Sequence, residues 1–380
     1  MADKQAVQQL WRPFVVGARD TQRPDYTATK ALTATTQKLD PYKLSTIGFV
    51  SAVYIYVSIA ASNPGGAVVA LQEDAPWSIF DSLTLYDVGS KPIGGSMSGA
   101  DWFEVIKHGG YTICDDERGN TGSTYTALTT GAGATAGSGT FCLRIPVAIN
   151  KRNGLGAIVN KNAGSTLRIE ANLGALSAIY STAPSAGATA TITMVIDGYL
   201  DAATSDTRGN PVHAEPPGGD TTQFLTKHSY AVNASSTGFK IKYDPVDGPV
   251  RSLLHIFRTT AAGTRAAGDA AWAPQSTIRY ENLDPWVWTD WFWRRRIASW
   301  FDYRGTPDAA RARSNGVYPF IFFDDFGLRA GVENGFKYLP VSSQVNMSIE
   351  GAWSAAGNLD VIVNKIYPGN ADPLTLTGGR

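Results

Sequence analysis

The two halves of this 380-residue chain carry similar short motifs in the same order, about 170 to 190 residues apart. The spacing varies only as loop insertions would require, and the shared order predicts that one domain has been duplicated. The four motif pairs are Ser82-Leu83-Thr84-Leu85-Tyr86 with Ser252-Leu253-Leu254-His255-Ile256, Asp101-Trp102-Phe103 with Asp290-Trp291-Phe292, Ile145-Pro146-Val147 with Tyr318-Pro319-Phe320, and Ile169-Glu170-Ala171 with Ile349-Glu350-Gly351.

Each half consists mainly of short strand-like runs. Segments such as SAVYIYVSIA at 51–60 and LDVIVNKIY at 359–367 are rich in β-branched and aromatic residues, and 39 glycines with 20 prolines supply the turns. About eight strands fall in each half, with a short helix expected at 98–110 in the first half. The predicted fold is all-β, with two tandem eight-stranded jelly rolls and short helices in the loops.

One segment separates the two halves. Residues 206–222 hold three prolines and three glycines with almost no apolar content, which is typical of a linker. The predicted organisation is an N-terminal arm at 1–44, a first jelly roll at 45–205, the linker at 206–222, a second jelly roll at 223–370 and a C-terminal tail at 371–380.

The segment DPWVWTDWFWRRRIASWFDY at 284–303 holds five of the ten tryptophans beside three consecutive arginines. Asp284 as N-cap and Pro285 in the first turn predict a helix running to about residue 300. Such a helix needs neighbours on several sides, because Trp and Arg would surround its axis. We predict an interface, either between the two rolls or between subunits, that contains Trp286, Trp288, Trp291, Trp293, Arg294, Arg295, Arg296 and Trp300.

The N-terminal arm has an apolar stripe at helical spacing, formed by Val7, Leu10 and Trp11, and basic residues outnumber acidic ones around it. Together with Arg12, these residues are expected either to contact a membrane surface or a neighbouring subunit, or to dock on their own subunit. Nowhere is there an apolar run near 18 residues, so no membrane-spanning helix is expected.

Charge and reactive side chains argue against several functions. Lys plus Arg and Asp plus Glu both number 33, so no overall field favours nucleic acid, and direct genome binding is not expected. The cysteines, Cys114 and Cys142, are expected to be reduced, although one disulfide between them is an alternative.

No catalytic or metal-binding pattern is evident. The four histidines lack zinc-ligand spacing, GGSMSG at 94–99 does not match GxSxG, and the acidic groups Asp115-Asp116-Glu117 and Asp324-Asp325 are expected to be solvated loop charges. The chain is therefore predicted to have no enzymatic activity, no cofactor and no obligatory metal.

Three segments resemble a known family. They are Trp293-Arg294-Arg295-Arg296-Ile297-Ala298, the aromatic run from Gly316 to Asp324, and GFVSAVYIYVSIAASN at 48–63 followed by SIFDSLTLYD. The chain resembles the double jelly-roll major capsid proteins of tailless, internal-membrane bacteriophages of the tectivirus type, and the likeness spans most of residues 45–367.

That resemblance implies a structural protein of the virion. Homotrimers would form pseudo-hexagonal tiles of an icosahedral shell over an inner membrane, assembled in the host cytoplasm, with neighbouring capsomers and minor capsid proteins as partners. The alternative is a jelly-roll carbohydrate-binding protein or glycoside-acting enzyme, which would need tryptophans on exposed strand faces. Nucleic-acid binding by Trp stacking ranks third.

Overall fold

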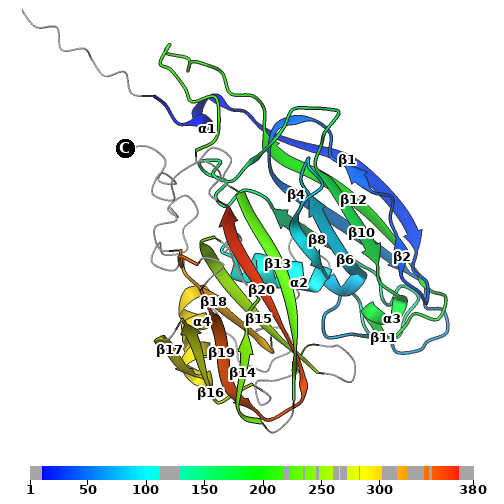
Figure 1. Ribbon diagram of the computed structural model, residues 1–380. Coiled ribbons are helices and arrows are strands. Elements are labelled where there is room, and N and C mark those ends of the chain that lie inside the picture. Colours follow the sequence, from blue (N-terminus) through cyan, green and yellow to red (C-terminus); the bar gives the residue numbers. More distant parts are fainter. Residues whose placement is uncertain are drawn as a thin grey trace, which may run out of the picture.

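The computed structural model describes residues 11–111, 128–217, 222–233, 236–244, 248–259, 265, 272–281, 283–301, 315–323, 338–341 and 345–367 (Figure 1). Four sheets, antiparallel except where β7 pairs with β13, and short helices make up the described part. The strands fall into two groups that lie side by side, which we call the first roll (residues 20–199) and the second roll (residues 222–367).

The first roll is built from β1 (Asp20–Ala31), β2 (Gln37–Lys38), β3 (Tyr42–Lys43), β4 (Ile47–Ala61), β6 (Phe80–Tyr86), β7 (Pro92–Met97), β8 (Gly139–Pro146), β10 (Arg168–Leu173) and β12 (Ala188–Tyr199). One sheet has the order β1-β12-β4-β8, and in the other β7, β6 and β10 are followed by β2 and β3. If the short strands β2 and β3 count as one, the roll has eight strands. Numbered from 1 to 8 along the chain, these strands have the order 1-8-3-6 in one sheet and 2-7-4-5 in the other. This is the jelly-roll arrangement of two sheets.

The second roll repeats this arrangement. Its strands are β13 (Thr222–Val232), β14 (Ser236–Lys242), β15 (Val250–Thr259), β16 (Gln275–Tyr280), β17 (Leu283–Thr289), β18 (Val317–Ile321), β19 (Met347–Trp353) and β20 (Gly357–Tyr367). The orders β13-β20-β15-β18 and β14-β19-β16-β17 are again 1-8-3-6 and 2-7-4-5. The all-β double jelly roll predicted from the sequence is confirmed.

Short elements complete the chain. The helices are α1 (Phe14–Gly17), the 3-10 turn η1 (Trp77–Ile79), α2 (Gly99–His108), α3 (Leu176–Ile179) and α4 (Asp290–Phe301). The strands β5 (Ala70–Leu71) and β11 (Tyr180–Thr182) pair with each other, and β9 (Ile158–Asn160) pairs with β4. Helices α2 and α4 occupy the same place in their rolls, between the fifth and sixth strands.

Three of the four motif pairs fall on equivalent elements. The Asp-Trp-Phe motifs open α2 and α4, the proline motifs lie at β8 and β18, which are the sixth strands, and the Ile-Glu motifs lie on β10 and β19, which are the seventh. The remaining pair is wrong, because residues 82–86 lie on the fourth strand, β6, and residues 252–256 lie on the third, β15. Short runs that contain two leucines are common to many strands and do not identify one.

Two predicted boundaries need correction. Residues 20–43 are not part of an arm, because β1 hydrogen-bonds along β12 and is the first strand of the first roll, and β2 and β3 pair with β10. The helix expected from Asp284 begins only at Asp290, since residues 283–289 form β17. The linker predicted at 206–222 lies between the end of β12 and the start of β13, and the tail at 371–380 lies outside the described residues.

The two rolls share a sheet edge. Strand β7 of the first roll runs parallel to β13 of the second, with Gly94 opposite Leu225, so one nine-stranded sheet crosses both rolls. Gly95 permits this approach to β13, and Gly94 leaves room for Trp102 of helix α2 in its own roll. A Cβ on Gly94 would lie 2.4 Å from the Trp102 ring, and one on Gly95 would lie 3.1 Å from the Leu225 carbonyl oxygen. Each roll keeps its own opposing sheet, so the rolls do not merge into one sandwich.

Candidate functional site

Helix α2 lies between the two rolls and is buried along its whole length. It begins at a capping box, in which the Asp101 backbone N–H donates to Ser98 Oγ and the Ser98 N–H donates to Asp101 Oδ2, both at 3.1 Å. Trp102 anchors the helix to its own roll, because its Nε1 donates to the Leu83 carbonyl at 3.0 Å. The opposite side of the helix carries Asp101, Glu104 and His108, all buried. The helix therefore turns its charged side toward the second roll.

The second roll meets Asp101 with two cations. Lys227 Nζ lies 2.8 Å from Asp101 Oδ2, and Arg258 Nη2 lies 2.7 Å from Asp101 Oδ1. Both cations also contact Asp360, at 2.9 Å from Lys227 Nζ and 2.8 Å from Arg258 Nε. Ser229 Oγ donates to the other Asp360 oxygen at 2.5 Å. This group ties the start of α2 to strands β13, β15 and β20.

The same network continues to the turn before η1. Asp74 Oδ2 lies 2.9 Å from Arg258 Nη1, and Asp74 Oδ1 lies 2.8 Å from Arg265 Nε. Arg265 also donates to the Asn315 carbonyl at 3.0 Å and approaches Glu104 at 3.6 Å. The first roll thus supplies the carboxylates Asp74, Asp101 and Glu104, whereas the second supplies the cations and Asp360. We call these seven residues the junction network: the carboxylates Asp74, Asp101, Glu104 and Asp360 and the cations Lys227, Arg258 and Arg265.

The pKa values of Asp74, Asp101 and Lys227 show that these three members of the junction network stay ionised inside the protein. Burial alone would raise the pKa of Asp101, but Arg258 and Lys227 outweigh it and hold the pKa below the ordinary value. The pKa of Asp74 is lowered in the same way, by Arg265 and Arg258 against burial. For Lys227, burial lowers the pKa, but Asp101 and Asp360 reverse the effect and raise it. Removing one partner would therefore leave an uncompensated buried charge.

The other end of α2 is held by Arg251, which is 1% exposed. Its Nη2 donates to the Gly109 carbonyl at the C-terminus of the helix at 2.7 Å. The guanidinium carbon lies 4.0 Å from the centre of the Phe323 ring and 4.9 Å from that of Tyr111. A cation at a helix C-terminus is favourable, because the last carbonyls have no partner within the helix.

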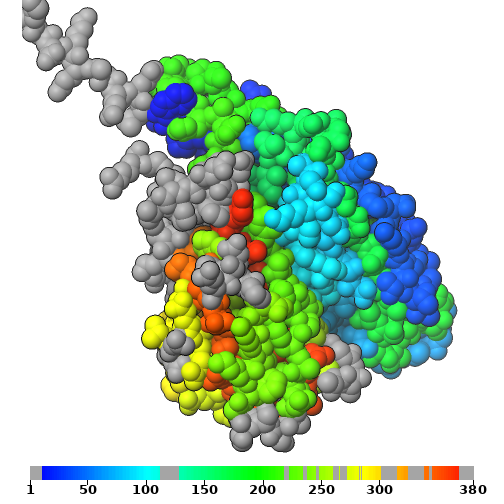
Figure 2. All heavy atoms as spheres, in the orientation of Figure 1, coloured from blue at the N-terminus to red at the C-terminus, as the bar shows by residue number. Residues whose placement is uncertain are grey.

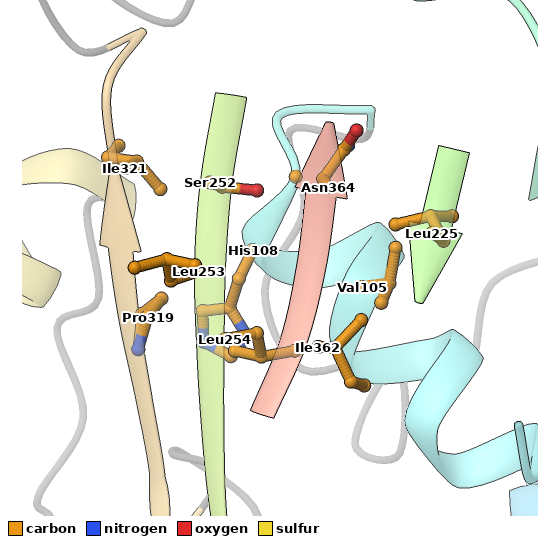
Figure 3. A pocket seen from close by; sticks show the side chains of 11 residues that line it. Val105, His108, Leu225, Ser252, Leu253, Leu254, Pro319, Ile321, Ile362 and Asn364 are labelled. Atoms are coloured by element: carbon orange, nitrogen blue, oxygen red, sulfur yellow. The ribbon is translucent and has the colours of Figure 1, made fainter. Parts of the chain in front are cut away.

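The middle of α2 packs on the outer face of the second roll's sheet. Figure 3 shows Val105 and His108 facing Leu225, Leu254 and Ile362. The cavity left between them measures about 10 Å³, which is room for one water and too small for a cofactor. The contact is therefore close-packed in its centre and charged at both ends.

The Trp–Arg segment lies in the second roll. Trp286 and Trp288 point inward from β17, and their rings lie 5.0 and 4.7 Å from that of Phe320 on β18. Trp293 is 1% exposed, and its Nε1 donates to the Pro319 carbonyl at 2.7 Å. Trp300 is also buried and lies beside Trp288. All these contacts stay within one roll, so among the described residues this segment builds the second roll, whereas α2 forms the junction between the rolls.

The three arginines have different environments. Arg294 lies over the Tyr318 ring at 4.1 Å and donates to the Val317 carbonyl at 2.8 Å. Arg296 lies over the Trp300 ring at 4.8 Å. Arg295 is exposed, as is Trp291, which is 67% exposed. A contact with another subunit therefore remains a prediction for Trp291 and Arg295, which face outward.

The described part of the N-terminal arm docks on its own subunit. The Arg12 N–H donates to the Pro211 carbonyl at 2.8 Å, and Phe14 is buried against Phe49 and Tyr199. Trp11, near His213, stays 58% exposed. Val7 and Leu10 lie outside the described residues.

His255 lies at the centre of the second roll, next to the Trp293 ring, and is fully buried. Its Nδ1 lies 2.9 Å from the Tyr318 carbonyl and its Nε2 lies 2.7 Å from Tyr243 Oη, which suits a neutral ring that donates from Nδ1 and accepts at Nε2. Burial lowers the pKa of His255 to about 4, although the Tyr318 carbonyl opposes the shift.

The lowered pKa of His255 predicts that the folded protein loses stability at acidic pH. As the pH falls below the ordinary His value of 6.5, the unfolded chain binds a proton that the folded protein does not, so stability falls until about pH 4. The expected loss is roughly 3 kcal/mol. Urea unfolding at a series of pH values measures it, and the His255→Gln variant should lose most of the slope above pH 5. Buried His108, whose pKa is also lowered, and near pH 4 the carboxylates of the junction network are the remaining contributors. A wild-type slope that survives unchanged in the variant would contradict the assignment.

The remaining candidates from the sequence are scattered or lie elsewhere. Cys142 is half-buried on β8, whereas Cys114, Asp115-Asp116-Glu117 and Asp324-Asp325 lie outside the described residues. Within the described ranges, no group of His, Cys, Asp and Glu side chains could hold a metal ion. No helix in those ranges has the length and apolarity needed to cross a bilayer.

Comparison with known proteins identifies the fold. No protein-family model and no curated protein matches the chain. The MCP of STIV (Sulfolobus Turreted Icosahedral Virus) is 13% identical, with a TM-score of 0.60 over 90% of this chain and 96% of that chain. The PBCV-1 virus capsid is 11% identical, with a TM-score of 0.63 over 95% and 96%.

A third similar structure is the major capsid protein P2 from bacteriophage PM2. It is 8% identical, with a TM-score of 0.54 over 93% of this chain and 100% of that chain. At such low identities the likeness carries the fold alone. The chain has the double jelly-roll fold of viral major capsid proteins.

Proposed function

We propose that this chain is the major capsid protein of an icosahedral virus, a structural subunit of the virion without catalytic activity. The similar structures from STIV, PBCV-1 and PM2 match over at least nine tenths of both chains, so the likeness includes both rolls and their relative placement. The predicted resemblance to the capsid proteins of internal-membrane bacteriophages points the same way.

The observation that carries the proposal is the way α2 fixes the two rolls to each other. A shell tile needs a constant angle between its parts, and here a fully buried helix is held at both ends by ionised groups of the other roll. Each chain contains two rolls of the same topology, so three copies of the chain contain six similar rolls. We infer a homotrimer with a nearly hexagonal outline, because a closed three-fold ring of such chains approximates six-fold symmetry.

Electron microscopy of the purified protein tests this proposal. The expected result is trimeric tiles with a hexagonal outline in negative stain, a mass of three chains by light scattering, and closed shells under assembly conditions. A monodisperse monomer that binds glycans on an array would overturn it in favour of the carbohydrate-binding alternative. For that alternative, the exposed tryptophans, Trp11 and Trp291, are poorly placed, because neither lies on a strand.

The end of the first roll that carries α1 is proposed to face an inner membrane. Trp11 and Val16 are both more than half exposed there, although Phe14 anchors the same segment in the core. Arg12 and Arg19 lie beside them, and exposed apolar side chains next to cations suit an anionic lipid surface.

Deleting residues 1–10 is expected to leave folding and the trimer intact, because the docking contacts of Arg12 and Phe14 remain. Binding to anionic vesicles and closure of shells should fall, because Val7 and Leu10 are removed. Flotation with vesicles, light scattering and thermal melting measure the three properties. Deleting residues 1–30 is the contrasting variant, and it should unfold the first roll because β1 is lost. Unfolding by the short deletion would contradict this placement.

A further inference from the structure

Inside the chain, a helix of one roll covers a sheet of the other. Helix α2, between the fifth and sixth strands of the first roll, lies on the outer face of the second roll's 1-8-3-6 sheet. That face contributes Leu225, Leu254, Ile256 and Ile362 to the apolar cluster of the first roll. The contact is directional, with a helix on one side and a sheet on the other.

Both counterparts of this contact carry exposed or half-exposed side chains in the described part of the chain. Helix α4 is the equivalent helix of the second roll, and together with edge strand β17 it presents an exposed apolar surface. We call Trp291 and Arg295, which lie four residues apart on α4, together with Val287 on the adjoining strand the helix face; Trp291 and Val287 are 67% and 50% exposed. Strand β17 pairs only with β16, so its outer edge has no strand beside it among the described residues.

The outer face of the first roll's 1-8-3-6 sheet is the second counterpart. We define the sheet face by Tyr54, Tyr56, Ser58, Cys142, Thr191 and Thr193, which alternate with buried residues on β4, β8 and β12. Tyr56 is 39% exposed and lies opposite Thr193 and Cys142 in the register. None of the six is charged at neutral pH; Arg144, which alternates in phase with Cys142 on β8 and lies opposite Tyr54, is a charged side chain that flanks them. Tyrosine-rich patches depleted of charge are typical of interface centres.

The two faces lie at opposite margins of the molecule. Figure 1 shows α4 and β17 along one margin and β1 and β12 along the other, and in Figure 2 the yellow atoms of α4 and the blue atoms of β1 are separated by the breadth of both rolls. A helix face and a sheet face so far apart cannot meet within one chain. They can meet between copies arranged head to tail.

We propose that the helix face of one copy docks on the sheet face of a second copy, so that the helix-on-sheet contact made by α2 inside the chain is repeated by α4 between chains. This assignment rests on the proposed trimer and names its contact surfaces. The occupant is a second copy because the chain itself supplies both counterparts, in the same topological positions as the internal contact. A contact between two different surfaces generates a ring when its rotation closes.

The α2 contact inside the chain is permanent, whereas the proposed α4 contact between chains forms only on assembly, and the surfaces differ accordingly. The internal sheet surface is apolar and is always covered, whereas the sheet face carries threonine and tyrosine, which tolerate water before assembly. The charged residues also differ, because α2 brings the carboxylates Asp101 and Glu104 to cations, whereas the exposed charge on α4 is Arg295. The Tyr56 ring suits an arginine because aromatic faces attract cations, whereas Arg144 of the same chain already lies 5.8 Å from the Tyr54 ring.

Two substitutions test the assignment, one on each face. Trp291→Glu breaks the helix face and Tyr56→Glu breaks the sheet face, and each should convert the trimer to a folded monomer in sedimentation velocity, with the far-UV circular dichroism unchanged. Mixing the two variants should produce a heterodimer, because the intact helix face of Tyr56→Glu fits the intact sheet face of Trp291→Glu. The heterodimer cannot close into a ring. Val68→Glu, at an equally exposed valine outside both faces, should remain trimeric.

The outcomes separate this inference from the proposed function. If wild-type protein is monomeric at every concentration, the proposed function fails. If wild-type protein is trimeric and either Trp291→Glu or Tyr56→Glu is trimeric too, the capsid proposal stands and this pairing of surfaces is wrong. If both variants are monomeric but their mixture contains no heterodimer, the two faces do not contact each other, and the pairing is again overturned.

Discussion

Replacing Arg258 by Met is expected to lower the free energy of unfolding by about 3–5 kcal/mol, because it leaves buried carboxylates without their shared cation. The guanidinium contacts Asp74, Asp101 and Asp360 at 2.7 to 2.9 Å, and those carboxylates come from both rolls. Met keeps much of the side-chain volume, so the loss reports the charge and not a cavity. Urea unfolding followed by tryptophan fluorescence measures it.

A surface ion pair provides the matched control. Arg279 Nε lies 2.9 Å from Glu350 Oε2, but both side chains are about a third to a quarter exposed. Arg279→Met should therefore cost no more than about 1 kcal/mol. Adding Asp101→Asn to Arg258→Met should recover part of the loss, because one uncompensated charge is removed. If Arg258→Met costs as little as Arg279→Met, the junction network does not hold the rolls together.

The duplicated double jelly roll could be predicted because two signals agree. Alternation in runs such as β12 gives the strands, and motifs such as Ile169-Glu170-Ala171 and Ile349-Glu350-Gly351 repeat on equivalent strands. Strand β1 was missed because it is an edge strand with the polar sequence DTQRPDYTATKA. An edge strand can pair fully on one side without an apolar pattern, so hydrophobicity alone does not reveal it.

The Trp–Arg segment shows what composition does and does not determine. Its aromatic content predicts burial, and Trp286, Trp288, Trp293 and Trp300 are indeed packed together. The composition does not reveal which contacts bury these tryptophans, nor that residues 283–289 form a strand. The alternation of Trp286, Val287 and Trp288, with Val287 outward, is the signal that could have indicated β17.

The junction could not be predicted from local sequence. Asp101, Glu104 and His108 have the spacing of a solvated helix face, and their burial depends on residues far along the chain. Asp101 is 126 residues from Lys227 and 157 from Arg258. The capping box identifies the helix but not its surroundings. Only the placement of the second roll decides that this face is an interface.

Trp293→Ala is expected to lower the free energy of unfolding by about 3–5 kcal/mol, as truncation of a packed aromatic side chain does. The Trp293 ring contacts Trp272, Trp288, His255 and Tyr318 at centroid distances of 5.3 to 5.8 Å. The substitution also leaves the buried Pro319 carbonyl without its Nε1 donor. Trp293→Phe should be intermediate, because it keeps an aromatic ring and loses only the hydrogen bond and part of the packing.

Trp291, two residues earlier on the same helix, is the matched control for Trp293. It is 67% exposed, so Trp291→Ala should change the free energy of unfolding of the isolated chain by no more than about 0.5 kcal/mol. Its effect should appear instead in the association constant, measured by sedimentation over a range of concentrations. Trp293→Ala should show the reverse, with stability lost and association unchanged wherever the chain is folded. If both substitutions affect the same property, α4 does not divide into a face that builds the second roll and a face that meets another subunit.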